Sequence, residues 1–126
     1  MKGTNQLQAL TGVIFQAMNS RDFTRLEQYL EDRVIFDFPG ADRAEGSRRT
    51  LLLLKSILRK YPELKFRVLE VIAEEGKACA VWTNEGVDIR GNPYRNSGIT
   101  LMHFTGGKIS FISDYFKDTS FKDRLK

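Results

Sequence analysis

The chain has 126 residues, 41% hydrophobic and 29% charged, which excludes an intrinsically disordered protein and predicts a single domain, residues 1–126, with its own core. Its formal net charge is +4, but Lys and Arg are interleaved with Asp and Glu and no stacking aromatics accompany them, so we expect no nucleic-acid partner. Leu51 to Leu54 form the longest aliphatic run, too short to span a membrane, and residues 1–19 lack the pattern of a signal peptide. We therefore expect a cytoplasmic protein in which the single cysteine, Cys79, is a small core residue.

Apolar residues at helical spacing predict three helices in the first half of the chain. The break NSRD separates the first two, and the third begins at a predicted N-cap, Ser47, and ends before Pro62. Between the second and third helices, the alternating stretch RVIFDFPG predicts a short strand that stops at Pro39. The positions expected to face the core are Leu7, Leu10, Ile14 and Met18, then Phe23, Leu26 and Leu30, and finally Leu51, Leu54, Ile57, Leu58 and Tyr61.

Four longer strand-like runs complete the chain. They are KFRVLEVIAE, KACAVWTNEGVDI, YRNSGITLMHF and KISFISDYF, and the turn signals EGK, RGNP and TGG separate them. This order predicts an α+β fold, in which a curved, cone-shaped antiparallel sheet wraps around three N-terminal helices. Sheet and helices would together enclose a mostly apolar cavity.

Several of these segments resemble one known superfamily. The segments AMNSRDF, VIFDFPG, EGSRR and RGNPYRNSGITLMHFTGGKISFISDYFKD are similar, in this order, to the nuclear transport factor 2 superfamily, and within it to SnoaL-like polyketide cyclases and ketosteroid isomerases. The resemblance covers nearly the whole chain and implies the same cone-shaped fold. Its members include isomerases, dehydratases, cyclases, epoxide hydrolases and non-catalytic binding domains, so it implies no single activity.

The resemblance to ketosteroid isomerases makes Asp37 a candidate general base. It stands in VIFDFPG where those enzymes carry their catalytic aspartate. Their oxyanion hole, a tyrosine and a protonated aspartate, has no counterpart here, because Ile14 and Met102 occupy the matching positions. Without these donors the developing enolate loses its main electrostatic stabilisation, so we do not expect a steroid isomerase.

The resemblance to SnoaL-like cyclases and limonene-type epoxide hydrolases makes Asp114 a second candidate. It takes the place of an acid or base aspartate on their last strand. The hydrolases also use an Arg-x-Asp pair on an earlier strand, where this chain has Asn84 and Glu85 but no arginine. An epoxide hydrolase with that triad is therefore not expected.

The direction of the Asp114 side chain depends on the turn that precedes its strand. A three-residue turn at TGG would pair Phe104 with Lys108 and place Asp114 on the face of Met102, whereas a two-residue turn at GG would group it with His103. We favour the three-residue turn, since it puts glycine where a positive φ is required. His103 would then lie on the outer face of the sheet, in a subunit contact.

These residues predict a pocket for a small, mostly apolar organic molecule, with no cofactor and no metal, since a single histidine excludes a His-rich site. The expected chemistry is an isomerase- or cyclase-type proton transfer, in which Asp37 or Asp114, with a pKa raised by apolar surroundings, removes a proton next to a carbonyl. The residues expected to bind the substrate are Ile14, Trp82, Met102 and Phe104. The alternative is a non-catalytic ligand-binding or assembly domain, in which Asp114 forms an ion pair and Asp37 caps loop amides.

The outer face of the sheet is expected to form a homodimer. One face of the predicted strands carries more apolar surface than a monomer usually exposes. The residues expected on this face are Val81, Val87, Ile99, Leu101 and His103.

Overall fold

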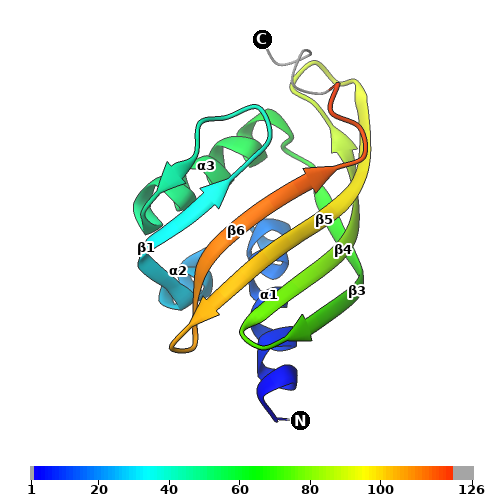
Figure 1. Ribbon diagram of the computed structural model, residues 1–126. Helices are drawn as coiled ribbons and strands as arrows, with labels where there is room; N and C mark the ends of the chain where they lie inside the picture. The colour runs from blue at the N-terminus through cyan, green and yellow to red at the C-terminus, as the bar shows by residue number, and fades with distance from the viewer. Residues whose placement is uncertain (1, 121–126) are drawn as a thin grey trace.

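Three helices pack on one six-stranded sheet (Figure 1). The computed structural model describes residues 2–120, with side chains from residue 6 onward. The helices are α1 (Lys2–Ser20), α2 (Thr24–Tyr29) and α3 (Ser47–Lys60), and the strands are β1 (Leu30–Asp37), β2 (Ala44–Glu45), β3 (Lys65–Glu74), β4 (Lys77–Val87), β5 (Pro93–Thr105) and β6 (Lys108–Phe116). Within residues 2–120, no helix is both long and apolar enough to cross a membrane.

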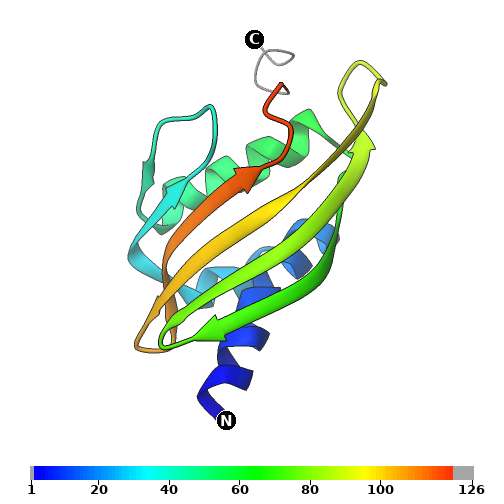
Figure 2. The same ribbon diagram turned by 45° about the vertical axis from the view of Figure 1, so that its right-hand side comes forward.

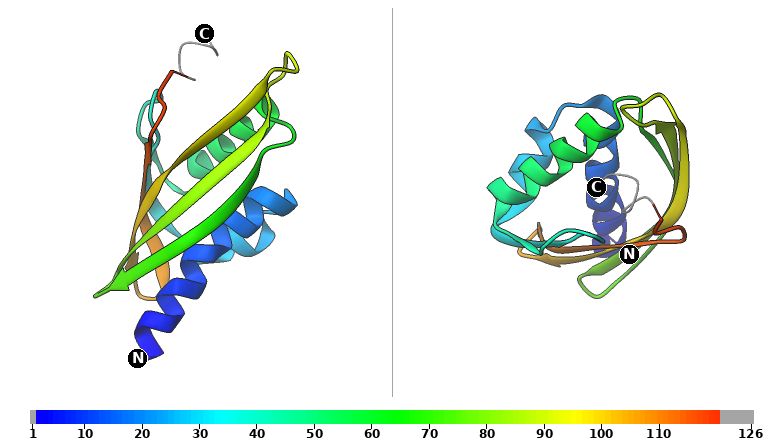
Figure 3. Two further views of the ribbon diagram at one scale, coloured as in Figure 1. Left: turned by 90° about the vertical axis from the view of Figure 1, so that its right-hand side faces the viewer. Right: turned by 90° about the horizontal axis from the view of Figure 1, so that it is seen from above.

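The sheet has the strand order β2-β1-β6-β5-β4-β3. It is antiparallel, as predicted, except where β1 lies parallel to β6, a pairing that the sequence did not predict. The short strand β2 was not predicted. The predicted α+β fold is confirmed: the sheet bends around the helices while its two edges stay apart, which leaves the cone unclosed (Figure 3).

Two helix boundaries differ from the sequence prediction. Gly46, not Ser47, is the N-cap of α3, and its φ of 100° lies in the left-handed half of conformational space that glycine adopts without strain. Its amide donates a hydrogen bond to the carbonyl oxygen of Val34 at 2.7 Å, which ties the start of α3 to β1. Leu30, predicted to belong to the second helix, is the first residue of β1 and is buried.

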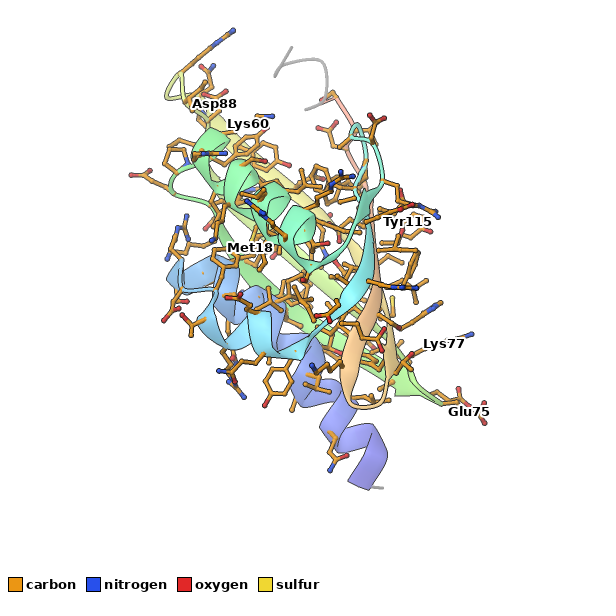
Figure 4. The ribbon with its side chains drawn as sticks, turned by 90° about the vertical axis from the view of Figure 1, so that its left-hand side faces the viewer. Met18, Lys60, Glu75, Lys77, Asp88 and Tyr115 are labelled. Carbon is orange, nitrogen blue, oxygen red and sulfur yellow. The ribbon has the colours of Figure 1, made fainter. Side chains whose placement is uncertain are left out.

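The core lies between the helices and the inner face of the sheet, the face that the helices cover. A Cβ atom does not fit at Gly98, because it would overlap the backbone oxygen of Tyr115 and lie 3.1 Å from the indole ring of Trp82. Met18 points from α1 toward the sheet, whereas Tyr115 lies on the opposite, outer face of β6 (Figure 4). The largest fully buried hydrophobic side chains are Trp82, Phe36, Leu26, Leu30, Leu64, Met102, Ile109, Ile112 and Val34.

The turn between β5 and β6 has two residues, so the predicted three-residue turn was wrong. Thr105 pairs with Lys108, and Gly106 and Gly107 both have positive φ, at 59° and 80°. Two consecutive positive φ values match the twist of an antiparallel hairpin, and glycine adopts them without strain. The turn lies at the same end of the molecule as the beginning of α1 (Figure 2).

A β-bulge in β6 nevertheless puts Asp114 where it was predicted. The pairing shifts between Phe104, opposite Ile109, and His103, opposite Phe111, so that Ser110 is an extra residue in β6. This extra residue reverses the change of face that the shorter turn would cause. Asp114 therefore shares the inner face with its partner Thr100, and His103 lies on the outer face.

Candidate functional site

A narrow cavity lies between the helices and the inner face of the sheet. The space between its lining atoms is about 530 Å³ including the mouth, but only about 40 Å³ is wide enough for the centre of a water molecule. Its lining residues are mostly aliphatic and aromatic, two tyrosines included, and the polar ones are Asn84, Thr100 and Asp114. The lining residues are Ile14, Phe15, Met18, Phe38, Leu54, Ile57, Tyr61, Leu64, Phe66, Asn84, Tyr94, Thr100, Asp114 and Phe116.

Asp114 ends a chain of two hydrogen bonds. The indole Nε1 of Trp82 donates to Thr100 Oγ1 at 2.9 Å, and Thr100 Oγ1 donates to Asp114 Oδ1 at 2.6 Å. The direction of donation follows from chemistry, because an indole N–H is a donor only and the hydroxyl group has a single proton. Oδ1 is thus occupied as an acceptor, and a proton bound by Asp114 belongs on Oδ2.

Burial changes the acidity of this carboxyl group. Removal of the charged form from water raises the pKa of Asp114 from 3.8 to about 7. The hydrogen bond from Thr100 lowers this pKa, and the negative charge of Asp37 raises it. At neutral pH the group is therefore present in both forms, the state in which a carboxyl group can take up and release a proton.

Asp37 does not line the cavity. It pairs with Ser113 of β6, one residue before Asp114, so the two carboxylates lie on opposite faces of the sheet. The side chain of Asp37 is 43% exposed, and its Oδ2 lies 3.6 Å from a guanidinium nitrogen of Arg43. The candidate base Asp37 therefore does not join Asp114 in the cavity lining, and the reason is the register between β1 and β6.

Only one of the four predicted substrate-binding residues lines the cavity. Ile14 lines the cavity, but Trp82 and Met102 are 1% and 0% exposed and belong to the packed core behind the lining. Phe104 is half-buried and also lies outside the lining. Trp82 still supports the site, because its ring packs edge-on against Phe66 and Phe116, at centroid distances of 5.3 and 5.2 Å.

Asn84 is a site residue that the sequence reasoning did not predict. It lines the cavity, is only 5% exposed, and its carbonyl oxygen Oδ1 has no hydrogen-bond partner. The spacing of two residues from Trp82 was the available signal, since alternate residues of a strand share a face. Among the described residues, Thr50 Oγ1 is the other buried side-chain atom without a partner, and Thr50 does not line the cavity.

Two further predictions concern Cys79 and metal binding. Cys79 is half-buried on the outer face, opposite Leu101 and Ile72, so its prediction as a core residue was wrong; partial burial raises the pKa of its thiol. Over the part of the chain described, no three His, Cys, Asp or Glu side chains lie close enough together to hold a metal ion.

The family model of the SnoaL-like domain matches residues 14–112, so the chain belongs to the SnoaL-like family of the nuclear transport factor 2-like superfamily. No curated protein sequence matches significantly. A protein from a soil-derived mobile gene cassette is similar in structure, with a TM-score of 0.87, 16% identity and 96% of each chain covered.

Two other similar structures have names that refer to a reaction. A candidate polyketide cyclase from Xanthomonas campestris pv. campestris has a TM-score of 0.85 and 18% identity, with 98% of each chain covered. AclR, a candidate hydroxylase from Streptomyces galilaeus, has a TM-score of 0.78 and 18% identity, covering 97% of this chain and 85% of its own. At such low identities these likenesses establish the fold only.

Proposed function

We propose that this protein binds a small, flat, mostly apolar organic molecule in the inner cavity and that Asp114 exchanges a proton with it. One observation carries the proposal: a carboxyl group with a pKa of about 7 borders an aromatic-lined cavity. The narrowness of the cavity favours a flat molecule, whose entry requires lining side chains to move apart. The name of the similar Xanthomonas protein, a candidate polyketide cyclase, supports the same class of ligand.

In the proposed reaction, ionised Asp114 removes a proton from a carbon next to a carbonyl group. The electron pair of the C–H bond moves to the carbonyl oxygen and gives an enolate, and the proton then returns from Asp114 to another atom of the same molecule. The net change is an isomerisation. In a ring closure the enolate carbon instead forms a C–C bond to a second carbonyl carbon of the same molecule, and the oxygen that receives the displaced π electrons takes the proton from Asp114; neither reaction consumes a co-reactant. Thr100 holds Oδ1, so Oδ2 carries the proton in each step.

Hydrogen exchange into a simple ketone tests this proposal. In heavy water, the protein should accelerate the loss of the α-protons of 1-tetralone, measured by proton NMR. Asp114→Asn should lower this acceleration by about 100-fold or more, the usual contribution of a positioned general base. Asp37→Asn is the matched control and should retain it. Equal exchange by wild type and Asp114→Asn would contradict the proposal.

A second candidate function is ligand binding without catalysis. Among the side chains that the structure describes, no Lys, Arg or His lines the cavity, so none of these supplies a cation at the position where an enolate oxygen would form. The same measurement separates the two functions, because a pure binding protein would bind 1-tetralone without accelerating its exchange.

The outer face of the sheet is the proposed homodimer interface. Ile99 and Tyr115 pair with each other there and are 37% and 55% exposed. Light scattering should give twice the mass of the chain, and Ile99→Glu should lower it to one chain; a wild-type monomer at high micromolar concentration would contradict the proposal. We further propose action in the cytoplasm without a nucleic-acid partner.

A further inference from the structure

We infer that Asn84 supplies a second polar contact to the bound molecule, and that this molecule therefore carries a hydroxyl or N–H group at the end remote from Asp114. The inference rests on the proposed function, because it assumes that the inner cavity is a ligand site. It adds the chemical character of the ligand: an elongated, flat molecule with a hydrogen-bond donor at one end and the reacting carbonyl at the other.

The side-chain carbonyl oxygen of Asn84 is buried and unpaired, and the residue is only 5% exposed. Buried polar groups are nearly always hydrogen-bonded, since an unpaired acceptor loses its contacts with water and gains nothing in return. Because Asn84 lines the cavity, a donor that enters the cavity can pair with this carbonyl oxygen and stabilise it.

Asn84 and Asp114 lie at different levels of the sheet, on strands that are not neighbours. Asp114 lies opposite Thr100, and Thr100 lies opposite Ala80, whereas Asn84 is four residues further along β4. On a flat sheet these positions would be roughly 13 Å apart along the strands and roughly 10 Å across them, and curvature brings the inward side chains closer. Both residues border the same cavity, so a molecule that contacts both is elongated.

Aromatic side chains stand beside both polar groups. Phe66 pairs with Asn84 from the neighbouring strand β3, Phe116 follows Asp114 by two residues on β6, and both rings line the cavity and pack against the buried indole of Trp82. These side chains offer no charge, so the body of the ligand is apolar and its polar contacts lie at Asn84 and Asp114. A donor facing Asn84 fixes which end of the molecule approaches Asp114.

A pair of naphthalene derivatives tests the inference. 2-Naphthol and 2-methoxynaphthalene are both flat and largely apolar, but only the first can donate a hydrogen bond. In titration calorimetry below the pKa of Asp114, wild type should bind 2-naphthol about threefold to tenfold more tightly than 2-methoxynaphthalene, as one neutral hydrogen bond contributes. Asn84→Leu and Asn84→Ala should each bind the two probes equally, and Asp114→Leu should retain the preference.

Thr50→Val is the matched control, because it removes the other buried unpaired oxygen without changing the cavity lining. It should retain the wild-type preference, and neither it nor Asn84→Leu should lower the melting temperature of the unliganded protein. The inference is overturned if wild type shows no preference, if the preference survives in both Asn84 variants, or if both variants fail to fold. If neither naphthalene derivative binds to wild type at about millimolar concentration, the proposed ligand site is overturned as well. If the probes bind but wild type does not accelerate the exchange of 1-tetralone, only the proposed chemistry is overturned.

Discussion

Asp37 and Asp114 lie on neighbouring strands, yet their surroundings differ in almost every respect. Asp37 is half exposed and faces Arg43, whereas Asp114 borders an apolar cavity and accepts a hydrogen bond from Thr100. The parallel register of β1 and β6 pairs Asp37 with Ser113, so a single residue of offset separates the two faces. Two carboxylates on neighbouring strands can therefore form one site only when they lie on the same face of the sheet.

The two faces impose different physical chemistry. On the inner face, loss of water raises the pKa of Asp114 to about 7 and makes the group able to transfer protons near neutral pH. On the outer face, water and an exposed arginine accompany Asp37, and an ion pair of this kind contributes little to stability. The following predictions change one face at a time.

Deletion of Ser110 should have the largest effect. Without this extra residue, the two-residue turn would move Asp114 and its strand to the opposite face and expose Ile112. We expect a loss of at least about 4 kcal/mol of unfolding free energy, enough to unfold many domains. Ser110→Ala keeps the chain length and should change the stability by less than about 1 kcal/mol in urea denaturation. A deletion variant as stable as wild type would contradict the role of the bulge.

Asp114→Asn should change the pH dependence of stability. The folded pKa of Asp114 lies above its ordinary value of 3.8, so the wild type binds this proton more tightly when folded and loses stability as pH rises from about 4 to about 7. The loss should be on the order of 2 to 4 kcal/mol, and Asn removes it, which makes the variant the more stable protein above pH 7.

Urea denaturation at about pH 4 and about pH 8 measures this difference between wild type and variant. Asp37→Asn is the control and should keep most of the wild-type slope, slightly reduced because the charge of Asp37, a minor cause of the raised pKa of Asp114, is lost. Carboxyl NMR should show Asp114 titrating near pH 7. A pKa below 3.8 together with a less stable Asp114→Asn variant would mean that the carboxylate is a structural ion-pair member.

Thr100→Val should act on both ends of its hydrogen-bond chain. The indole N–H of Trp82 would be left buried and unpaired, which costs about 1 to 3 kcal/mol. The pKa of Asp114 should rise further, because the hydrogen bond that lowers it is lost. Thr100→Ser keeps the hydroxyl group and should restore both properties. Denaturation and carboxyl NMR of the two variants test this, and an unchanged pKa in Thr100→Val would exclude the hydrogen bond as a cause.

Arg43→Ala should have the smallest effect. The ion pair with Asp37 is long and both partners are about half exposed, so its removal should cost less than about 1 kcal/mol. The effect should shrink further in high salt, since exposed charges are screened. A larger loss of unfolding free energy would show that the ion pair between Asp37 and Arg43 stabilises the fold, contrary to its exposed position.

Local patterns in the sequence determined the elements and most of their orientations. Helical spacing identified the buried face of α3, and alternation in β4 placed Trp82 on one face and Val81 on the other. These patterns are readable because a side chain's direction within one helix or strand depends only on its neighbours along the chain. The inner position of Asp114 was predicted from a three-residue turn that does not form, and it is the bulge at Ser110 that restores it.

Only the tertiary structure decided which polar groups meet. The parallel pairing of β1 with β6 joins segments about 75 residues apart, and its offset removes Asp37 from the cavity. The bulge at Ser110 compensates for the short turn, the burial of Asn84 leaves its carbonyl unpaired, and the depth of Asp114 sets its pKa. Each of these depends on distances between strands and on excluded water, which are properties of the packed molecule and not of any stretch of sequence.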